Sequence, residues 1–188
     1  MYKAREVSPN TSIYLCDEAL NDEECEFYRS IIDNETCHVE DHDEIHNVKC
    51  DFLLSEESSN VVQSEIFRTF GKIIGEVHRH TGCNSRRIES IVMRKIHGET
   101  KYHSDNIAPG KSEYEHVVVA DLRVYSIIIA LNDDYEGGEL YFPCQKIKLK
   151  LKKGQAIIFP PYWTHPHGST NLLNNTVRYT LNTWATGE

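Results

Sequence analysis

The sequence predicts a mainly β fold of the α+β class, a β-sandwich or jelly roll with helices packed outside it. Before Gly82, apolar residues recur at helical spacing in two segments; after it they follow the period of two that is typical of strands, in short runs separated by glycine and proline turns. The length of 188 residues suits one domain with a sizeable core. We therefore expect a single domain over residues 1–188, with a helical support region at 1–85 and a jelly-roll core at 86–188.

Two amphipathic packing helices are expected in the first half of the chain. The first covers residues 17–32, where Asn21 followed by three acidic residues suits an N-cap and a first helical turn. The second begins near Ser55 and carries its apolar residues on one stripe, and Gly82 can close it.

Residues 37–46 form an acidic run that contains three histidines. The run could be taken for a metal site, but it has no periodicity, so we interpret it as a solvated loop. The six cysteines of the chain are far apart and form no CxxC pair, which indicates reduced thiols rather than a zinc site or a disulfide scaffold.

Strands are expected to follow one another after residue 86. Residues 125–131 are too continuously apolar for a sheet with one wet face, so they predict a strand that is buried on both faces. Residues 146–152 alternate, with four lysines expected outward; we interpret these as a solvated or edge-protecting face rather than as a site for an anionic partner. The other expected strands are 48–54, 87–96, 101–105, 156–160 and 177–185.

The net charge of −9 disfavours a broad phosphate-binding surface, so a nucleic-acid partner is not expected. The first residues contain no apolar h-region, and no later run approaches the length of a membrane span. We expect a soluble, cytoplasmic protein without membrane association.

The His-x-Asp motif at His103 and Asp105 has metal-binding potential. In an extended strand residues i and i+2 point to the same face, so the two side chains can offer an imidazole nitrogen and a carboxylate oxygen to one ion. Far downstream, His165 and His167 are two candidates for a third ligand. A histidine, a carboxylate and a remote histidine form the facial triad of non-haem Fe(II) sites, which leaves about three coordination positions open.

The last expected strand places four polar or aromatic side chains on one face by the period of two: Arg178, Thr180, Asn182 and Trp184. If that face is inward, a buried arginine needs an anionic partner, and a dicarboxylate co-substrate would provide it. The polar loop at 106–114, directly after the metal motif, is a candidate lid.

The ordered motifs HSD, GGELYF, GQAIIFP, PHG and RYTLNTW resemble those of the 2-oxoglutarate- and Fe(II)-dependent oxygenases, in particular the prolyl 4-hydroxylase-like branch. The resemblance covers roughly residues 88–185. It implies a double-stranded β-helix that binds Fe(II), 2-oxoglutarate and dioxygen, with ascorbate as reductant. It also implies hydroxylation of a C–H bond, with a prolyl residue in a peptide or protein as the leading substrate and with release of succinate and CO2.

The resemblance also implies roles for single residues. Fe(II) would be held by His103, Asp105 and a distal histidine; His167 is preferred to His165 because it lies 11 rather than 13 residues before Arg178, closer to the family spacing, and stands between a proline and a glycine. Arg178 would bind the far carboxylate of 2-oxoglutarate through a bidentate pair. Thr180 and Asn182 match positions that line the same pocket.

The sequence departs from the family at two tyrosine positions, one shortly before the His-x-Asp motif and one at Ala130. Tyr125 or Tyr102 could supply the missing hydroxyl to the co-substrate pocket. Arg123 and Trp184 are the expected substrate contacts.

Two alternatives remain open. The same chemistry could act on a free amino acid, a small metabolite or an alkylated nucleobase, although the net acidity counts against nucleobases. A jelly-roll metal protein of cupin type, without oxygenase activity, would use the paired histidines at His165 and His167 and would have no need for Arg178.

Overall fold

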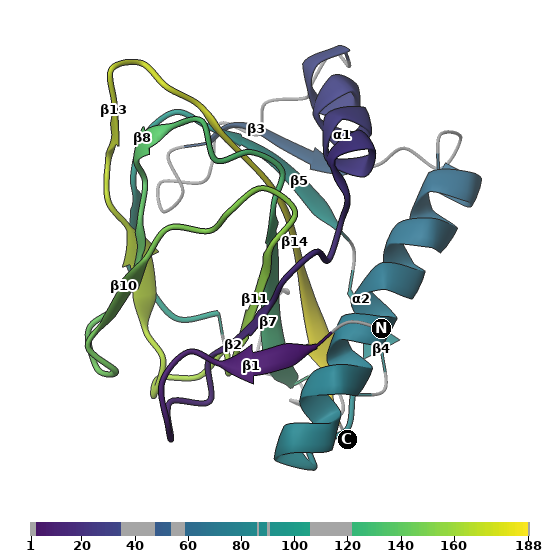
Figure 1. The fold of residues 1–188 in the computed structure, drawn as a ribbon, viewed down its shortest axis with the longest axis vertical. Coiled ribbons are helices and arrows are strands. Elements are labelled where there is room, and N and C mark those ends of the chain that lie inside the picture. Colours follow the sequence, from purple (N-terminus) through teal and green to yellow (C-terminus); the bar gives the residue numbers. More distant parts are fainter. Residues whose placement is uncertain are drawn as a thin grey trace, which may run out of the picture.

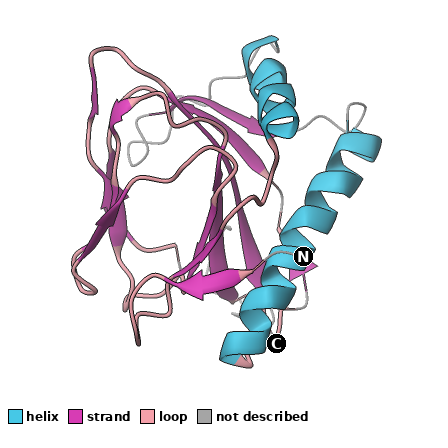
Figure 2. Ribbon diagram, viewed as in Figure 1, coloured by secondary structure: helices cyan, strands magenta, loops and turns pink. Residues whose placement is uncertain are grey.

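The structure, a computed structural model, describes residues 3–34, 48–53, 59–85, 87–89, 91–105 and 122–187. Within these ranges two antiparallel sheets form a sandwich, and both helices lie on the outer side of the larger sheet (Figures 1 and 2). The predicted jelly roll with helices packed outside it is therefore confirmed. The acidic run at 37–46 and the candidate lid at 106–114 lie outside the described residues.

The strands of the larger sheet are β1 (Ala4–Glu6), β2 (Tyr14–Cys16), β3 (Val48–Leu53), β4 (Arg87–Ile88), β5 (Val92–Ile96), β7 (Arg123–Ala130), β11 (Ala156–Phe159) and β14 (Arg178–Thr186). Their order is β1-β2-β11-β7-β14-β5-β3, with β4 paired to β14. Three of these strands precede residue 85, so the N-terminal region contributes strands as well as the expected helices.

The smaller sheet contains β6 (Thr100–His103), β9 (Leu140–Phe142), β10 (Ile147–Leu149) and β12 (His167–Ser169) in the order β10-β9-β12-β6, and β8 (Glu136–Gly137) pairs with β13 (Leu172–Leu173) nearby. Strands of two or three residues carry too little periodicity to be recognised, which is why β1, β2, β8, β12 and β13 were not expected. The single strand expected at 87–96 is divided into β4 and β5. β6 ends at His103, so Asp105 lies just beyond the strand.

Helix α1 (Asp22–Asn34) begins directly after the predicted N-cap Asn21, so residues 17–21 of the expected helical segment precede it. The Asn21 side chain accepts a hydrogen bond from the backbone N–H of Glu24 at 2.9 Å, and the Glu24 carboxylate accepts one from the backbone N–H of Asn21 at 2.7 Å. The helix buries Cys25, Tyr28 and Ile32 against the larger sheet.

Helix α2 (Ser59–Thr81) ends as predicted at Gly82, which adopts a φ of 67° and donates its N–H to the His78 carbonyl at 2.8 Å. Its fully buried side chains include Ile66, Phe70 and Ile73. Neither described helix combines the length and the apolar character that crossing a bilayer requires.

β7 divides the apolar interior into two parts. Ile127 and Ile129 pack toward the helices, whereas Ala130 belongs to the cluster between the two sheets. In that second cluster the rings of Phe142 and Phe159 meet edge to face at 4.9 Å. The prediction of a strand buried on both faces is confirmed, and the four lysines of 146–152 are exposed as expected.

Asp33 fastens α1 to the larger sheet, because it accepts hydrogen bonds from Tyr179 on β14, at 2.9 Å, and from Lys95 on β5. Partial burial raises the pKa of Asp33, but the hydrogen bonds from Lys95 and Tyr179 outweigh it, so the pKa lies below its usual value. A lowered carboxylate pKa contributes stability that is present above the unfolded-state pKa and is lost as the pH falls through the folded one.

We expect Asp33→Asn to lower the free energy of unfolding by about 1 kcal/mol at neutral pH, the scale of a charged hydrogen bond at a partly exposed site. The difference from the wild type should begin to shrink near the ordinary aspartate value of about 3.9 and should vanish only below the lower folded-state pKa. Urea unfolding at both pH values measures this. Asp133→Asn is the control at an exposed position, and an equal loss there would contradict the assignment.

Candidate metal centre and co-substrate cavity

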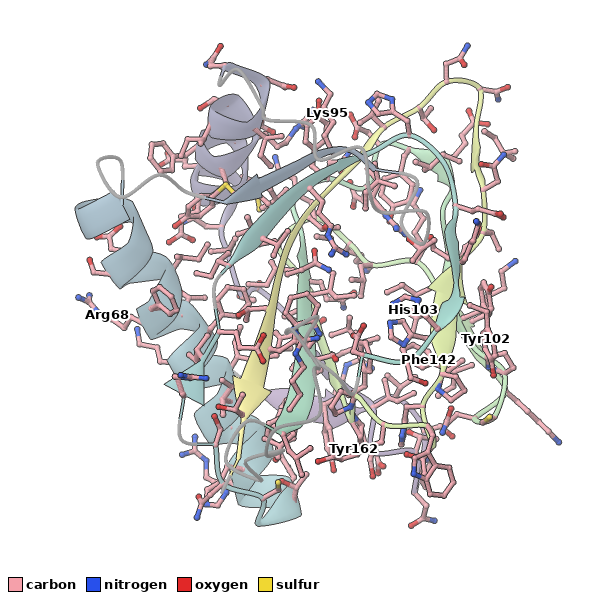
Figure 3. The ribbon with its side chains drawn as sticks, turned by 180° about the vertical axis from the view of Figure 1, so that it is seen from behind. Arg68, Lys95, Tyr102, His103, Phe142 and Tyr162 are labelled. Carbon is pink, nitrogen blue, oxygen red and sulfur yellow. The ribbon has the colours of Figure 1, made fainter. Side chains whose placement is uncertain are left out.

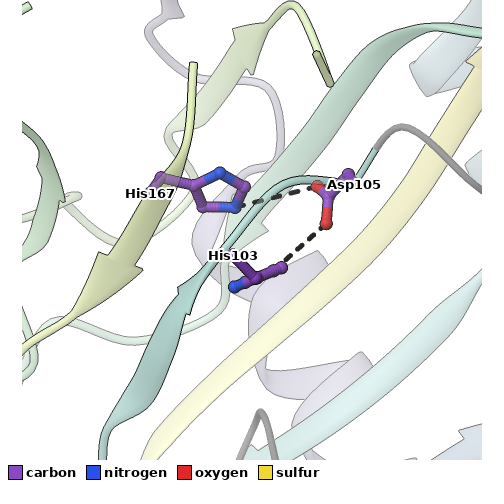
Figure 4. A group of neighbouring side chains, drawn as sticks. All are labelled: His103, Asp105 and His167. Carbon is purple, nitrogen blue, oxygen red and sulfur yellow. Dashed lines mark ion pairs between the residues drawn. The ribbon is translucent and has the colours of Figure 1, made fainter. Parts of the chain in front are cut away.

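Two side chains from the smaller sheet and one from just beyond its strand β6 converge on one point, as Figure 4 shows. His103 ends β6, Asp105 follows two residues later, and His167 begins β12 directly opposite His103 in the strand pairing. One ligand atom from each of the three lies within 4.8 Å of the others. Figure 3 shows that His103 and its neighbour Tyr102 point to opposite sides of their strand, as the period of two requires.

Both imidazoles are oriented by the backbone. Nδ1 of His103 lies 2.7 Å from the Lys101 carbonyl, and Nδ1 of His167 lies 3.2 Å from the His165 carbonyl. Because Nδ1 keeps its proton for the carbonyl, Nε2 is the nitrogen that would lose its proton and bind a metal. In the metal-free site a protonated His103 can instead donate from Nε2 to Asp105. Both Nε2 atoms face the Asp105 carboxylate, at 3.1 Å for His103 and 3.7 Å for His167.

Asp105 is anchored from the neighbouring sheet. The Ser126 hydroxyl on β7 donates a hydrogen bond to its carboxylate at 2.7 Å. Burial raises the pKa of Asp105, but the hydrogen bond from His103 and the proximity of His167 outweigh it and hold the pKa far below the usual range. Two imidazole nitrogens and one ionised carboxylate form the donor set of a facial-triad metal site.

The triad opens into a cavity between the two sheets that encloses about 620 Å³ of empty space, part of it open to solvent. Apolar atoms form most of the cavity surface, although most of the lining side chains also carry polar groups; a largely apolar surface is typical of small-molecule sites. The polar and aromatic lining residues beyond the triad are Arg94, Thr100, Ser126, Tyr135, Arg178, Thr180, Asn182, Thr183 and Trp184.

Arg178 lies in this cavity and is 5% exposed. Its Nη1 donates to the Gly138 carbonyl at 2.7 Å and its Nη2 to the Ser169 hydroxyl at 3.1 Å. Its Nε is buried and has no hydrogen-bond partner, and no carboxylate in the described part of the chain pairs with the guanidinium. Burial lowers the pKa of Arg178, and the nearby Arg94 lowers it further. A buried cation with an unused donor is suited to receive an anion.

The family model of the 2OG-Fe(II) oxygenase superfamily matches residues 90–186, just over half of the chain. The chain belongs to this superfamily. The protein is therefore a 2-oxoglutarate-dependent dioxygenase, and the enzymes of this family use Fe(II), 2-oxoglutarate and dioxygen. Membership in this superfamily rules out the alternative of a cupin-type metal protein without oxygenase activity.

Several solved structures share the fold of the oxygenase over nearly its whole length. The viral collagen prolyl hydroxylase of Paramecium bursaria Chlorella virus-1, in complex with 2-oxoglutarate, is 18% identical with a TM-score of 0.70, and the match covers 97% of this chain and 100% of that one. A Pseudomonas putida prolyl-4-hydroxylase is 11% identical with a TM-score of 0.69, over 95% and 94% of the two chains. A Trichoplax adhaerens prolyl hydroxylase, in complex with a hypoxia-inducible factor peptide fragment, is 12% identical with a TM-score of 0.70, over 95% and 84%.

At these identities the likeness establishes the fold of the oxygenase, which is that of the prolyl hydroxylases. No curated protein sequence matches the chain.

The inward face expected for the last strand of the oxygenase is confirmed, because Arg178, Thr180, Asn182 and Trp184 all line the cavity. The Thr180 hydroxyl donates to the Asn182 side-chain oxygen at 2.6 Å. The indole Nε1 of Trp184 is buried without a hydrogen-bond partner among the described residues.

The prediction that Tyr125 lines the co-substrate pocket is wrong. Its hydroxyl donates to the Cys83 carbonyl at 2.9 Å and lies 2.6 Å from the Thr81 hydroxyl, on the helix side of β7. Tyr102, 54% exposed, stacks on Tyr141 at 6.4 Å, outside the cavity. Among the described residues the tyrosine that lines the cavity is Tyr135, which the sequence did not single out because the connection between β7 and β8 has no periodicity.

His165 of the oxygenase is buried but belongs to the framework. Its Nε2 lies 2.7 Å from the Thr11 carbonyl and its Nδ1 lies 2.9 Å from the Thr164 hydroxyl, so both ring nitrogens already have partners. His167, not His165, joins the cluster with His103 and Asp105. Sequence reasoning also missed Ser126, although a lone hydroxyl inside the apolar run 125–131 is a detectable signal.

Gly168 lets β12 approach β6 closely behind the triad. A Cβ built at this position would lie 2.7 Å from the Thr100 carbonyl oxygen and 2.5 Å from the Tyr141 hydroxyl. We expect Gly168→Ala to lower the free energy of unfolding by about 1–3 kcal/mol, the usual cost of overpacking. Gly71→Ala on α2 is the matched control, because nothing lies within 4 Å of its Cβ position. It should stabilise the helix by about 0.5–1 kcal/mol, and urea unfolding compares the two.

Proposed function

We propose that the oxygenase holds Fe(II) through His103, Asp105 and His167, anchors 2-oxoglutarate on Arg178, and hydroxylates a prolyl residue in a peptide or protein, with release of succinate and CO2. One observation carries the proposal: the converging triad shares a single cavity with a buried arginine that no carboxylate of the described residues pairs with. Dioxygen would be the oxidant at the bound iron: 2-oxoglutarate would give up two electrons as it becomes succinate and CO2, and the C–H bond would give up the other two.

The donor set fits a divalent first-row transition metal such as Fe(II), with coordination positions left open. The Nε2 atoms of His103 and His167 are left as ligands by their Nδ1 hydrogen bonds, and the carboxylate of Asp105 supplies the negative charge. Ser126 would keep that carboxylate in its rotamer when the metal binds.

The co-substrate end of the cavity fits a dicarboxylate. Arg178 would hold the far carboxylate through charge-assisted hydrogen bonds that use its Nε–H, which has no partner within the described ranges. Thr180, next to it on the same face of β14, would offer a second polar contact. The apolar wall would exclude water from the reacting atoms.

The prolyl substrate is supported by the fold, which this chain has in common with prolyl hydroxylases from a virus, a bacterium and an animal. Trp184 would form one side of the substrate position, with its buried indole N–H available to a carbonyl oxygen.

A small carboxylic acid or a free amino acid is the second candidate substrate, and Arg94 favours it. Arg94 is 6% exposed and brings a second guanidinium to the cavity wall, beside Thr180 in the strand pairing. Together with Arg178 it gives the cavity wall positive charge, which would attract a small carboxylate more than an uncharged peptide.

Anaerobic titration of the Fe(II)-loaded protein with 2-oxoglutarate tests the metal and co-substrate assignments, since joint binding gives a metal-to-ligand charge-transfer band. If the band is missing, the proposal fails. Succinate release in the presence of proline-containing peptides, compared with free amino acids and small acids, then separates the two substrate classes. Running both assays with and without ascorbate tests the proposed reductant.

A further inference from the structure

Arg123 begins β7 and is 5% exposed, yet it does not line the cavity that the triad opens into. Its Nε donates to Oε1 of Glu89 at 2.9 Å and its Nη2 donates to Oε2 of the same carboxylate at 2.7 Å. Its Nη1 donates to the backbone carbonyl of Asp105 at 3.0 Å. The guanidinium therefore joins the Glu89 carboxylate, through two hydrogen bonds, to the backbone of the candidate metal ligand Asp105, through one.

A shift in the pairing register aims Arg123 at this position. Trp184 pairs with Ser126 and Ala185 with Tyr125, but the next residue of β14, Thr186, pairs with Arg123, so β7 has one extra residue there. Without the shift Arg123 would lie on the helix side with Tyr125, by the period of two. Such bulges redirect side chains next to functional sites.

Glu89 and Trp184 make the position of Arg123 rigid. The Glu89 N–H donates to the Trp184 carbonyl at 2.8 Å, and the Thr183 hydroxyl donates to the Glu89 carbonyl at 3.0 Å, which fixes Glu89 on β14. The guanidinium lies over the Trp184 ring, with Cζ 3.9 Å from its centroid. Asp105 lies beyond the end of β6, so it is not held by the hydrogen bonds between paired strands. Hydrogen bonds from Arg123 and Ser126, both on β7, hold it instead.

The charge of Glu89 matters as much as the geometry. Arg123 is buried and Glu89 partly so, with side-chain exposures of 7% and 18%, and their charges cancel close to the proposed cation site. An unpaired guanidinium at that place would repel a divalent cation in a medium of low dielectric constant.

We propose that Arg123 and Glu89 form a positioning pair for the metal ligand Asp105, and that Arg123 does not contact the substrate. The inference rests on the proposed function, because it concerns how one ligand of the metal is held. Arg123, expected from the sequence to contact the substrate, thereby acts at the metal centre.

Arg123→Met tests the proposal through metal affinity measured on the folded protein without substrate. Titration of the metal-free chain with Co(II), followed by its d–d absorption, should give a dissociation constant raised by roughly 10–100-fold, the cost of losing an outer partner of a ligand. Affinity for 2-oxoglutarate at saturating metal should stay at the wild-type value, because Arg178 is untouched. Arg68→Met, at an exposed position on α2 labelled in Figure 3, is the control and should change neither constant.

Two further variants keep the test decisive if Arg123→Met does not fold. Arg123→Lys retains a charge for Glu89, but it cannot reach both partners in the same fork geometry. Glu89→Gln keeps the size of the side chain and leaves the guanidinium unneutralised. Both should weaken Co(II) binding, and the urea midpoint of each metal-free variant shows whether any loss merely follows global stability.

Two results would overturn the inference. One is wild-type Co(II) affinity in the Arg123 variants together with a raised KM for the substrate, which would make Arg123 a substrate contact. The other is a loss of Co(II) affinity that tracks the urea midpoint alone, which would make the pair merely structural. A wild-type protein that binds neither Co(II) nor Fe(II) would instead overturn the proposed function, and this inference with it.

Discussion

His167→Gln should abolish detectable Fe(II) binding and, with it, succinate formation from 2-oxoglutarate. The substitution removes one of three ligand atoms that lie within 4.8 Å of one another, and no other histidine of the described residues joins that cluster. Because loss of an outer partner alone costs roughly 10–100-fold in metal affinity, loss of a ligand should cost more than that. Equilibrium titration with Fe(II) under anaerobic conditions, paired with a succinate assay, measures both effects.

His165→Gln is the matched control, two residues away in the same buried segment. It removes hydrogen bonds to the Thr11 carbonyl and the Thr164 hydroxyl, so it should lower the free energy of unfolding by about 1–3 kcal/mol while metal affinity is retained. The opposite pattern, with metal lost in His165→Gln and kept in His167→Gln, would make His165 the third ligand and would refute the proposed triad.

Arg178→Met should weaken 2-oxoglutarate binding by about 3 kcal/mol, roughly a hundredfold, because it removes the charged partner of a buried carboxylate. Fe(II) affinity should be unchanged, since no described contact joins Arg178 to the three triad residues. The charge-transfer band, titrated against 2-oxoglutarate at saturating Fe(II), reports the first quantity. Arg5→Met, at an exposed surface ion pair, is the control.

The stability of the metal-free protein gives Arg178→Met a second readout. A buried guanidinium without an anion is a desolvation cost to the fold, so methionine should leave the free energy of unfolding equal or higher. Addition of 2-oxoglutarate should raise the melting temperature of the metal-loaded wild type and not that of the variant. A variant that keeps wild-type 2-oxoglutarate affinity would remove Arg178 from the co-substrate site.

The helices, the buried strand β7 and the inward face of β14 could be predicted from the sequence because each has a long and regular pattern. Asn21 marked the start of α1 and Gly82 the end of α2 by their chemistry at helix ends. The two halves of the metal cluster were also predictable, since a His-x-Asp motif and a distant His167 are explicit in the sequence.

Which residues of β7 face the cavity could not be predicted. A strand that is apolar on both faces carries no amphipathic signal, so the sequence does not tell whether Tyr125 or Ser126 faces the co-substrate. The register shift beside Ala185 then places Arg123 and Tyr125 on opposite faces, against the simple alternation. Hydrogen bonds between distant segments, such as those from Arg123 to Glu89 and Asp105, leave no local pattern in a sequence.

Because His103 on β6 pairs directly with His167 on β12, a bound metal would link these two strands. An ion held by both imidazoles acts as a removable cross-link between β6 and β12, in a four-stranded sheet whose strands are only three or four residues long. Iron loading should therefore slow amide hydrogen exchange in this sheet much more than in the one covered by the helices, because metal binding and local ordering share one free energy. The half of the sandwich that carries the chemistry would thus gain its rigidity from its own cofactor.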